Sequence, residues 1–378
     1  MPARSRLFVL GLGAAATAVA VAAAPGAALL AARQTWPPFA LVAGLLLVGA
    51  AADGDGLFKT MGTRLAQAPA SGLVLYAAAL AAVAVVTAVL NLDTAVVFLT
   101  PVLLAAGRAR GLDDAPFLYG AVAMCNASSL VLPGSNLTNL LVLSHERLSG
   151  AAFALRMAPA SITAILVTAA LLLLLFRSRL SGRPPRGHVS SQPLRLGPGL
   201  PAVAVAAVLV LVLRHPAAPV LLVGLVAAGM SLALRRVEGA RLARALDAPL
   251  LIGVFLGAVA LGTLAHVWGG PARMLRSASG WETAVIGAVA SVALNNLPAA
   301  VLLGTRVPPH PRALLVGLNI GPNLAVTGAL SALLWLTIGR ASGARPSIRR
   351  YSLVGIVVAP AAIAAALLAL WAFGSHGL

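Results

Sequence analysis

The sequence predicts an all-α polytopic membrane protein, and three observations lead to this fold class. Of its 378 residues, 60% are hydrophobic and only 10% are charged, and the mean hydropathy is +0.97. A soluble domain carries about 25% charged residues, so this chain has too few to cover a surface in water. The apolar residues form long runs, and the charged ones lie in short segments between them. We expect about nine spans and two re-entrant hairpins, arranged as two inverted repeats that each contain one hairpin and one broken transmembrane helix.

The net charge of +18 does not indicate a nucleic-acid-binding protein. Aromatic residues make up only 4% of the chain, and no aromatic-basic face is present to hold a polynucleotide. The single cysteine excludes an internal disulfide and a cysteine-cluster metal site. No Gly-x-x-x-x-Gly-Lys-Ser/Thr loop occurs, so the chain is not expected to hydrolyse ATP. We therefore expect a transporter rather than an enzyme, with no cofactor and no metal centre, driven by a proton gradient or by sodium.

The first two apolar runs are Leu7–Ala32 and Phe39–Ala52. We interpret the first as a membrane helix rather than a cleaved signal peptide, because it exceeds the usual core of ~7–15 residues. The second is short for a span, which needs roughly 20 residues. We expect it to continue through the Asp53-Gly-Asp55-Gly break into an interfacial helix, Leu57–Gln67.

A polar, arginine-rich stretch at 177–197 divides the rest of the chain and predicts a basic cytoplasmic linker. Residues 1–176 then form an N-terminal repeat, and residues 198–378 a C-terminal repeat. Ten apolar runs follow the interfacial helix: Ser71–Leu90, Thr94–Gly107, Pro116–Ser144, Ala151–Phe176, Gly199–Leu213, Ala217–Leu234, Ala248–Trp268, Thr283–Gly304, Ala313–Ile338 and Tyr351–Phe373.

Two of these regions predict re-entrant hairpins, at 71–107 and 279–305. The first has Asn91-Leu92-Asp93-Thr94 between apolar runs, and the second has Asn295-Asn296-Leu297-Pro298. Polar residues in mid-run leave backbone groups without helical partners, which is tolerated only inside protein or beside a cavity. Full spans in place of both hairpins would leave the later orientation unchanged, so the charge pattern alone does not distinguish the two arrangements.

Two further regions, 116–144 and 313–338, predict broken helices. Aligned without gaps from Asn126 and Asn319, Thr138 falls on Ser331, and several leucines also coincide. Interrupted hydrophobic segments at corresponding positions of two halves point to the binding site of a secondary transporter.

The charge distribution predicts a cytoplasmic N-terminus. With both hairpins returning to their own side, 19 of the 27 Lys and Arg residues lie on the cytoplasmic side and 8 on the external side. This bias follows the positive-inside rule. We expect a multi-pass protein of a bacterial plasma (inner) membrane, with the lipid bilayer as its solvent.

Four motifs resemble the ArsB-type arsenite/antimonite efflux permeases, which belong to the ion-transporter superfamily with its citrate-transporter-like domain. The resemblance covers residues 36–373. The motifs are Thr100-Pro101, the run Pro133-Gly-Ser135-Asn136-Leu-Thr138-Asn139, the run Asn295-Asn296-Leu297-Pro298, and Gly321-Pro322-Asn323 followed by Thr327-Gly328. The resemblance implies two inverted repeats, a homodimer built on scaffold helices, elevator-like transport, and for some members an arsenic-binding ATPase subunit.

The chain departs from this family in three ways. The first hairpin tip reads Leu92-Asp93 where the family usually has Asn-Asp, and asparagine stands at both helix breaks where members often carry aspartate. The N-terminal region is also shorter by about two helices. The first two departures bear on the coupling ion and the cargo.

Asp93 is the candidate proton-coupling residue, because it is the only acid that we expect at membrane depth. The alternative is that its carboxylate only caps the second helix of the hairpin. Amides and hydroxyls at the tips and breaks suit a neutral oxyacid such as As(OH)₃, or an anion, but they also satisfy unwound backbone. The expected substrate-binding residues are Asn91, Asp93, Asn126, Ser128, Ser135, Asn136, Asn139, Asn295, Asn296, Asn323 and Thr327.

We expect an exporter of arsenite or antimonite that exchanges its cargo for protons. One alternative is a sodium-coupled anion symporter or a sodium/proton antiporter of the same superfamily. Another is a membrane scaffold that transports nothing, although a scaffold would not need polar breaks at matching places in both halves.

Overall fold

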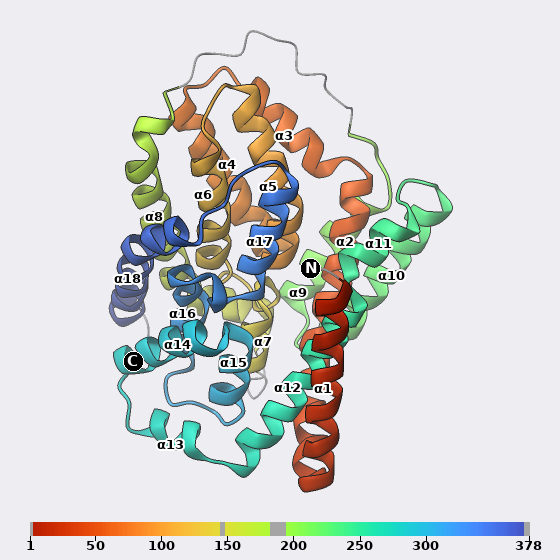
Figure 1. The fold of residues 1–378 in the computed structure, drawn as a ribbon, viewed down its shortest axis with the longest axis vertical. Coiled ribbons are helices and arrows are strands. Elements are labelled where there is room, and N and C mark those ends of the chain that lie inside the picture. The colour runs from red at the N-terminus through yellow and green to blue at the C-terminus, as the bar shows by residue number, and fades with distance from the viewer. Residues whose placement is uncertain (1–2, 144–147, 182–193, 374–378) are drawn as a thin grey trace.

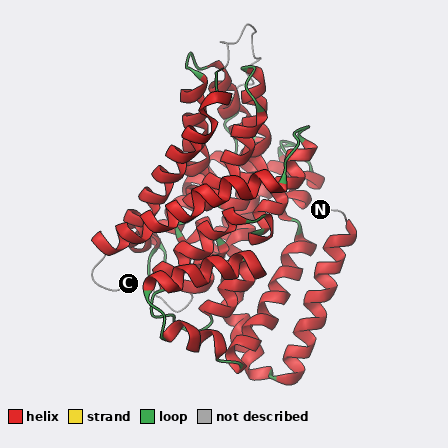
Figure 2. Cartoon of the chain, turned by 60° about the vertical axis from the view of Figure 1, so that its left-hand side comes forward, coloured by secondary structure: helices red, strands yellow, loops and turns green. Residues whose placement is uncertain are grey.

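The computed structural model describes residues 3–143, 148–181 and 194–373, and these fold into helices joined by short loops, with no strand among them (Figure 2). Seven helical stretches in these ranges are long and apolar enough to cross a membrane: Arg4–Ala23, Pro25–Gly54, Gly72–Val89, Leu92–Ala109, Gly150–Arg179, Gly239–Val267 and Ile348–Phe373. The prediction of an all-α polytopic membrane protein is therefore confirmed.

One group of helices, which we call the scaffold bundle, comes from two separate parts of the chain, residues 3–54 and 199–267. Small residues let these helices approach closely: a Cβ on Gly44 would lie 2.7 Å from the carbonyl oxygen of Val220, and one on Gly13 would overlap the backbone of Gly253. The bundle comprises α1 (Ala3–Ala23), α2 (Pro25–Gly54), α9 (Gly199–Val212), α10 (Ala217–Ala233), α11 (Gly239–Leu246) and α12 (Ala248–Val267).

The expected boundaries of the first two helices were wrong. The run Leu7–Ala32 breaks at Ala24, where Pro25 begins the 30-residue helix α2, and Phe39–Ala52 is only the second half of that helix. Proline fits the first turn of a helix, where its missing N–H has no partner to lose. The later pair Pro37-Pro38 lies inside α2 without ending it.

The helix predicted after the Asp53-Gly-Asp55-Gly break is present with the expected bounds as α3 (Leu57–Gln67), and its interfacial position stays a prediction. The carboxylate of Asp55 stabilises the break. The buried Asp55 carboxylate accepts hydrogen bonds from the N–H groups of Gly199 at 2.8 Å and Leu200 at 3.2 Å, which begin α9, and it pairs with Arg236 at 3.3 Å. Asp55 thus fixes the end of α2 against the start of α9.

The second group, the core bundle, contains the same order of elements twice: two helices that meet at a tip, a broken helix and a long helix. Figure 1 shows the first pair, α4 and α5, in the upper half of the molecule and the second pair, α14 and α15, in the lower half. The first set is α4 (Gly72–Val89), α5 (Leu92–Ala109), α6 (Asp114–Ser128), η1 (Pro133–Ser135), α7 (Leu137–Val142) and α8 (Gly150–Phe176), with η3 (Arg177–Arg179) after it. The second set is α14 (Gly280–Leu294), α15 (Asn296–Gly304), α16 (Pro311–Ile320), η4 (Gly321–Leu324), η5 (Val326–Gly328), α17 (Leu330–Ala341) and α18 (Ile348–Phe373), preceded by α13 (Gly270–Arg276).

Both predicted tips and both predicted helix breaks are present in this arrangement. The division into repeats at 1–176 and 198–378 agrees with the order of elements but stays a prediction, as do the re-entrance of the hairpins and the count of nine spans. Much of the predicted linker, residues 182–193, lies outside the described residues.

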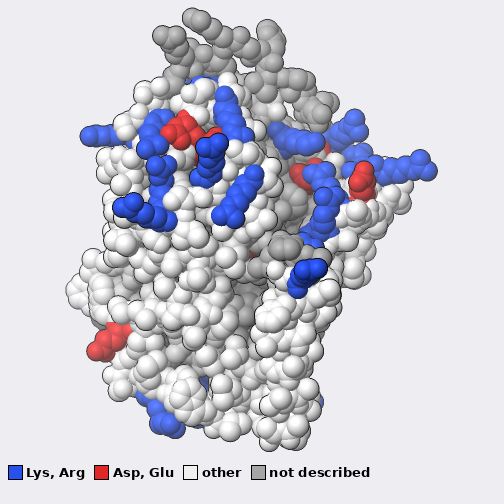
Figure 3. Space-filling view, in the orientation of Figure 1, with Lys and Arg blue, Asp and Glu red and all other residues white. Residues whose placement is uncertain are grey.

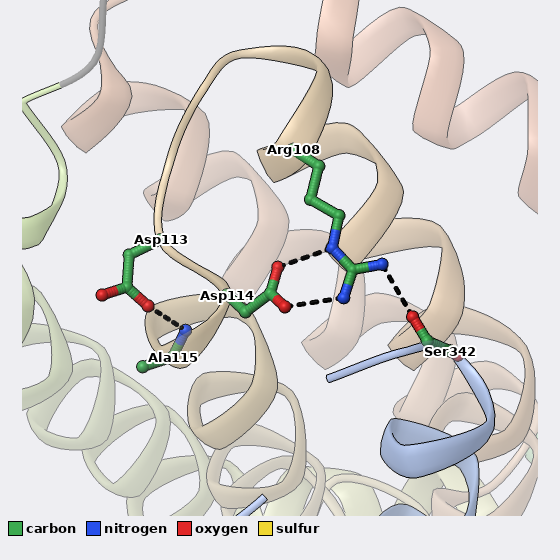
Figure 4. A network of polar contacts seen from close by, with 5 residues as sticks. All are labelled: Arg108, Asp113, Asp114, Ala115 and Ser342. Carbon is green, nitrogen blue, oxygen red and sulfur yellow. Dashed lines mark hydrogen bonds and ion pairs between the residues drawn. The ribbon is translucent and has the colours of Figure 1, made fainter. Parts of the chain in front are cut away.

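The charged residues are distributed unevenly over the molecule. Figure 3 shows basic side chains gathered over the upper part of the visible face and few over the lower part. At this end the two sets of core helices are joined by Arg108, which pairs with Asp114 at 2.6 Å and donates to the carbonyl oxygen of Ser342 at 2.7 Å (Figure 4). The carboxylate of Asp113 accepts from the N–H of Ala115 in the same network.

Candidate functional site

The two hairpin tips use asparagine in the same way. Asn91 directly precedes α5, and its side-chain oxygen accepts a hydrogen bond from the N–H of Thr94 at 2.6 Å. Asn295 ends α14, and its side-chain oxygen accepts from the N–H of Leu297 at 3.3 Å. Each amide caps the helix that follows, α5 or α15. The two next residues of each helix, Leu92-Asp93 and Asn296-Leu297, line one cavity.

The two helix breaks are tied together by side-chain amides. Asn319, on α16, accepts hydrogen bonds from Ser129 and Asn136, both at 2.6 Å. The amide nitrogen of Asn319 donates to Asn139 at 2.9 Å and to the carbonyl oxygen of Leu315 at 2.8 Å. Each of these residues is at most 3% exposed, so the network replaces the helical hydrogen bonds that both breaks give up.

A second amide contact joins the breaks on the other side. The amide nitrogen of Asn126, on α6, donates to the side-chain oxygen of Asn323, on η4, at 2.7 Å. Asn323 in turn donates to the carbonyl oxygen of Ala123 at 3.4 Å. The side-chain oxygen of Asn126 is buried without a hydrogen-bond partner among the described residues.

A cavity of about 250 Å³ lies between the core and scaffold bundles. Its core wall carries five polar residues, Asp93, Asn136, Asn296, Ser331 and Thr337, and no Arg, Lys or His among the lining residues that the structure describes. The hydroxyl of Thr337 is already used in a hydrogen bond to the carbonyl oxygen of Leu333 at 3.0 Å. Its scaffold wall carries Arg6, Arg244 and Asp247, together with apolar residues of α2 and α12. The starts of α5, α15 and α17 all reach the core wall, so the positive ends of three helix dipoles are directed at one space.

The polar groups of the core wall differ in how many of their hydrogen bonds are already made. Both polar atoms of the Asn136 amide are already hydrogen-bonded. Its nitrogen donates to the side-chain oxygen of Asn319, and its oxygen accepts from the N–H of Thr138 at 3.1 Å. The hydroxyl of Ser331 is buried with no partner among the described residues. No hydrogen bond or ion pair occupies the side chains of Asp93 and Asn296 within the same ranges. Asp93, Asn296 and Ser331 are therefore the groups with capacity to bind a ligand.

Three of the predicted binding residues, Asp93, Asn136 and Asn296, line this cavity, and the other eight do not. The amides of Asn91, Asn126, Asn139, Asn295 and Asn323 bond backbone or one another. Ser128 donates to the carbonyl oxygen of Met124, Ser135 to that of Ala88, and Thr327 to that of Val292. These eight side chains support the breaks and tips, which was the alternative reading of the sequence.

Sequence reasoning missed Ser331, and it missed that Asp247 and Arg6 share the cavity with Asp93. The alignment of the two halves did place Ser331 on Thr138, which was a usable signal. Asp247 carried no such signal, because it follows a short amphipathic helix and reads as a loop residue. Cys125 is fully buried, accepts a hydrogen bond from Thr87 and does not line the cavity.

Comparison with known proteins gives a family and a fold. A sequence model of the citrate transporter family, CitMHS, matches residues 5–316. The silicon efflux transporter LSI3 of Oryza sativa subsp. japonica is 27% identical over 146 residues, which are 39% of this chain and 30% of that protein, so the match spans less than a third of the relative. The crystal structure of the YdaH transporter of Alcanivorax borkumensis superposes with a TM-score of 0.56 over 97% of this chain and 96% of that one, at 14% identity. This last likeness is one of fold.

Proposed function

The chain belongs to the citrate transporter family of membrane transporters, and from this premise we propose that it exports arsenite or antimonite in exchange for protons. The observation that carries the proposal is the chemistry of the core wall. It offers a carboxylate, an amide and a hydroxyl with unused hydrogen-bonding capacity, and it has no cation. A neutral trihydroxy acid supplies O–H donors to such acceptors and needs no positive charge to hold it.

The relative of rice supports the same class of cargo. Its name describes a silicon efflux transporter, and hydroxylated silicon is, like As(OH)₃, a small neutral oxyacid. The four motifs shared with the ArsB-type permeases support the arsenic-group metalloids in particular.

Asp93 provides a route to proton exchange. As a carboxylate it accepts hydrogen bonds from the hydroxyls of the cargo, and these charge-assisted bonds are about twice as strong as neutral ones. A proton bound at the same oxygens removes the charge and one acceptor, so the proton and the cargo compete for Asp93. Competition for one group is what obligatory exchange requires: the core wall carries the cargo in one direction and the proton in the other.

The same proposal includes a membrane orientation, a transport cycle and partners. In this proposal the charge-rich end of the molecule lies in the cytoplasm of a bacterium, and the side with Arg6 and Arg244 is the one at which cargo is loaded into the cavity. The core bundle moves against the scaffold bundle in an elevator-like cycle, with the scaffold forming a homodimer. An arsenic-binding ATPase is a further possible partner that the family resemblance implies.

A second candidate is a sodium-coupled carrier of a carboxylate or another anion. Arg6 and Arg244 on the scaffold wall, the three helix starts and the family's citrate transporters favour it. Against it stands Asp93, because an ionised carboxylate on the core wall repels an anion held there.

Transport in inside-out membrane vesicles separates the two candidates. Proton-driven arsenite uptake should be independent of sodium and abolished by Asp93→Asn. Glu282→Gln is the matched control, because Glu282 is an exposed acid at the far end of the second hairpin that only caps α14. Strict dependence on sodium, or full arsenite transport by Asp93→Asn, would contradict the proposed function.

A further inference from the structure

The cavity has two walls that belong to different bundles. Asp93, Asn296 and Ser331 come from the core bundle, and Asp247 comes from the joint between α11 and α12 of the scaffold bundle. An acid on the scaffold wall is unexpected, because a second carboxylate beside Asp93 adds repulsion to the site.

The backbone at Asp247 is also unusual. Its φ of 42° and ψ of 54° lie in the left-handed region, which favours glycine and which aspartate adopts at some cost. An aspartate before a helix commonly accepts a hydrogen bond from the helix N–H groups, but the side chain of Asp247 makes no such bond to α12. A helix cap therefore does not explain why an acid stands here.

The carboxylate of Asp247 is only half used. One oxygen pairs with the guanidinium of Arg6, on α1, at 3.0 Å. The other oxygen is buried and has no hydrogen-bond partner among the described residues. Arg6 lines the cavity as well, so the ion pair holds Asp247 against the cavity while one acceptor remains open.

We propose that Asp247 is a cargo contact that exists only while the core wall faces this part of the scaffold. Its open oxygen accepts a hydrogen bond from a hydroxyl of a hydroxylated metalloid acid whose other hydroxyls bind Asp93, Asn296 and Ser331. When the core bundle moves along the scaffold bundle, the core contacts travel with the cargo and the Asp247 contact is left behind. This inference rests on the proposed function. It identifies Asp247 as the residue that makes the affinity of the cavity for cargo differ between the two faces of the membrane.

As a consequence, the exporter binds the metalloid acid more tightly on the side where it is loaded than on the side where it is released. One charge-assisted hydrogen bond lost between the two states corresponds to roughly a tenfold difference in affinity. The Ser331 contact travels with the core, so its loss weakens both faces alike.

Arsenite exchange across vesicles of opposite orientation tests this asymmetry. Half-saturating arsenite concentrations are measured at the cytoplasmic face in inside-out vesicles and at the external face in right-side-out vesicles. Asp247→Asn and Asp247→Gly should both raise the cytoplasmic value about tenfold and leave the external value unchanged. Ser331→Ala should raise both values equally. Asp247→Gly also relieves the left-handed backbone, so its effect does not come from a failure to fold.

Glu238→Gln is the matched control, because Glu238 is an exposed acid at the other end of α11 that makes no cap hydrogen bond and does not line the cavity. Equal effects of Asp247→Gly at both faces, or no effect at either, would overturn the inference while leaving the proposed function in place. A wild-type protein that carries no arsenite at either face contradicts the proposed function, and the role of Asp247 falls with it.

Discussion

The two hairpin tips share a geometry and differ in chemistry. Asn91 and Asn295 both cap the helix that follows, and the next two residues of each tip line the cavity. The first tip presents an apolar residue and then an acid, Leu92-Asp93, whereas the second presents an amide and then an apolar residue, Asn296-Leu297. The backbone of Asn91 is extended, but Asn295 has a φ of 83°.

The difference shows how a repeated architecture can hold an unsymmetrical site. The capping asparagines produce the same kind of helix start in both halves, so both tips contribute to the lining of the cavity. In the proposed exchange, the carboxylate of the first tip is the group that binds a proton, and the amide leaves the second tip neutral. The proposed exchange therefore depends on which tip carries the acid as well as on the fold.

The largest expected effect comes from moving that acid. Asp93→Leu should lower proton-driven arsenite transport by about 100-fold, because two charge-assisted hydrogen bonds from the hydroxyls of the cargo are lost, at roughly 1.5 kcal/mol each. Adding Leu297→Asp places a carboxylate at the equivalent position of the second tip, where it lines the same cavity. The double variant should recover at least about a tenth of the transport rate. No recovery in the vesicle assay would mean that the two tips are not interchangeable.

The next effect concerns the breaks. Asn319→Ala removes the acceptor of Ser129 and Asn136 and the donor to Asn139, and should lower the free energy of unfolding by roughly 2–3 kcal/mol. Asn126→Ala removes one amide contact, to Asn323, and should cost roughly 1 kcal/mol. Denaturant unfolding of the purified protein in detergent measures both. Equal losses would show that the two breaks contribute alike.

A smaller difference is expected between the caps. Asn91→Ala loses the bond to the N–H of Thr94 and should destabilise the protein by about 1 kcal/mol. Asn295→Gly loses a longer cap bond and an exposed bond to the carbonyl oxygen of Thr327, but it removes the strain of a positive φ, so its change should stay below that of Asn91→Ala. The thermal midpoint in detergent orders the two variants, and a larger loss for Asn295→Gly would contradict the comparison.

The smallest effect lies at the outer ends of the hairpins. Arg108 joins the first hairpin to the second half of the core, whereas the second hairpin ends in a local capping box of Ser279 and Glu282. Arg108→Gln should cost less than about 1 kcal/mol, because the pair is largely exposed. Glu282→Gln, at a fully exposed site, should shift the thermal midpoint less than Arg108→Gln does. A thermal midpoint lowered by several degrees for either variant would contradict the expectation.

The neighbouring Asp113 makes the stability of the folded protein depend on pH, by an amount similar to the cost expected for Arg108→Gln. Burial raises the pKa of Asp113, but the N–H of Ala115 and the guanidinium of Arg179 outweigh it and hold the pKa below its ordinary value of 3.8. A lowered pKa in the folded state means that this contribution is present above pH 3.8 and is lost as the pH falls through the folded value. The exposed carboxylate contributes a fraction of about 1 kcal/mol. Asp113→Asn should remove this part of the loss of stability in acid.

The sequence was sufficient to predict the helical membrane fold, the bounds of α3, both tips and both breaks. Polar residues that interrupt an apolar run are tolerated in a bilayer only where they are buried in protein or line a cavity. It was not sufficient to decide which amides face a ligand. Asn136 and Asn296 line the cavity while Asn126 and Asn139 do not, and this depends on the partner that each amide finds across the two halves. The citrate transporter match confirms the superfamily, and the cargo stays a proposal.

The first helices were misjudged for a related reason. Proline reads as a helix breaker, yet Pro37-Pro38 lies inside α2, while the actual break at Ala24 is marked only by Pro25. Packing of α2 against α10 and α12 decides the outcome there, and local preference does not.

The length of α2 has a consequence for the membrane itself. Its 30 residues extend about 45 Å, whereas the hydrocarbon layer of a bilayer is about 30 Å thick. A rigid helix of that length must tilt, project beyond the hydrocarbon layer or thicken the lipid around it. Because α2 also forms part of the cavity wall, the thickness of the host membrane acts on the wall along which the core bundle would move in the proposed cycle.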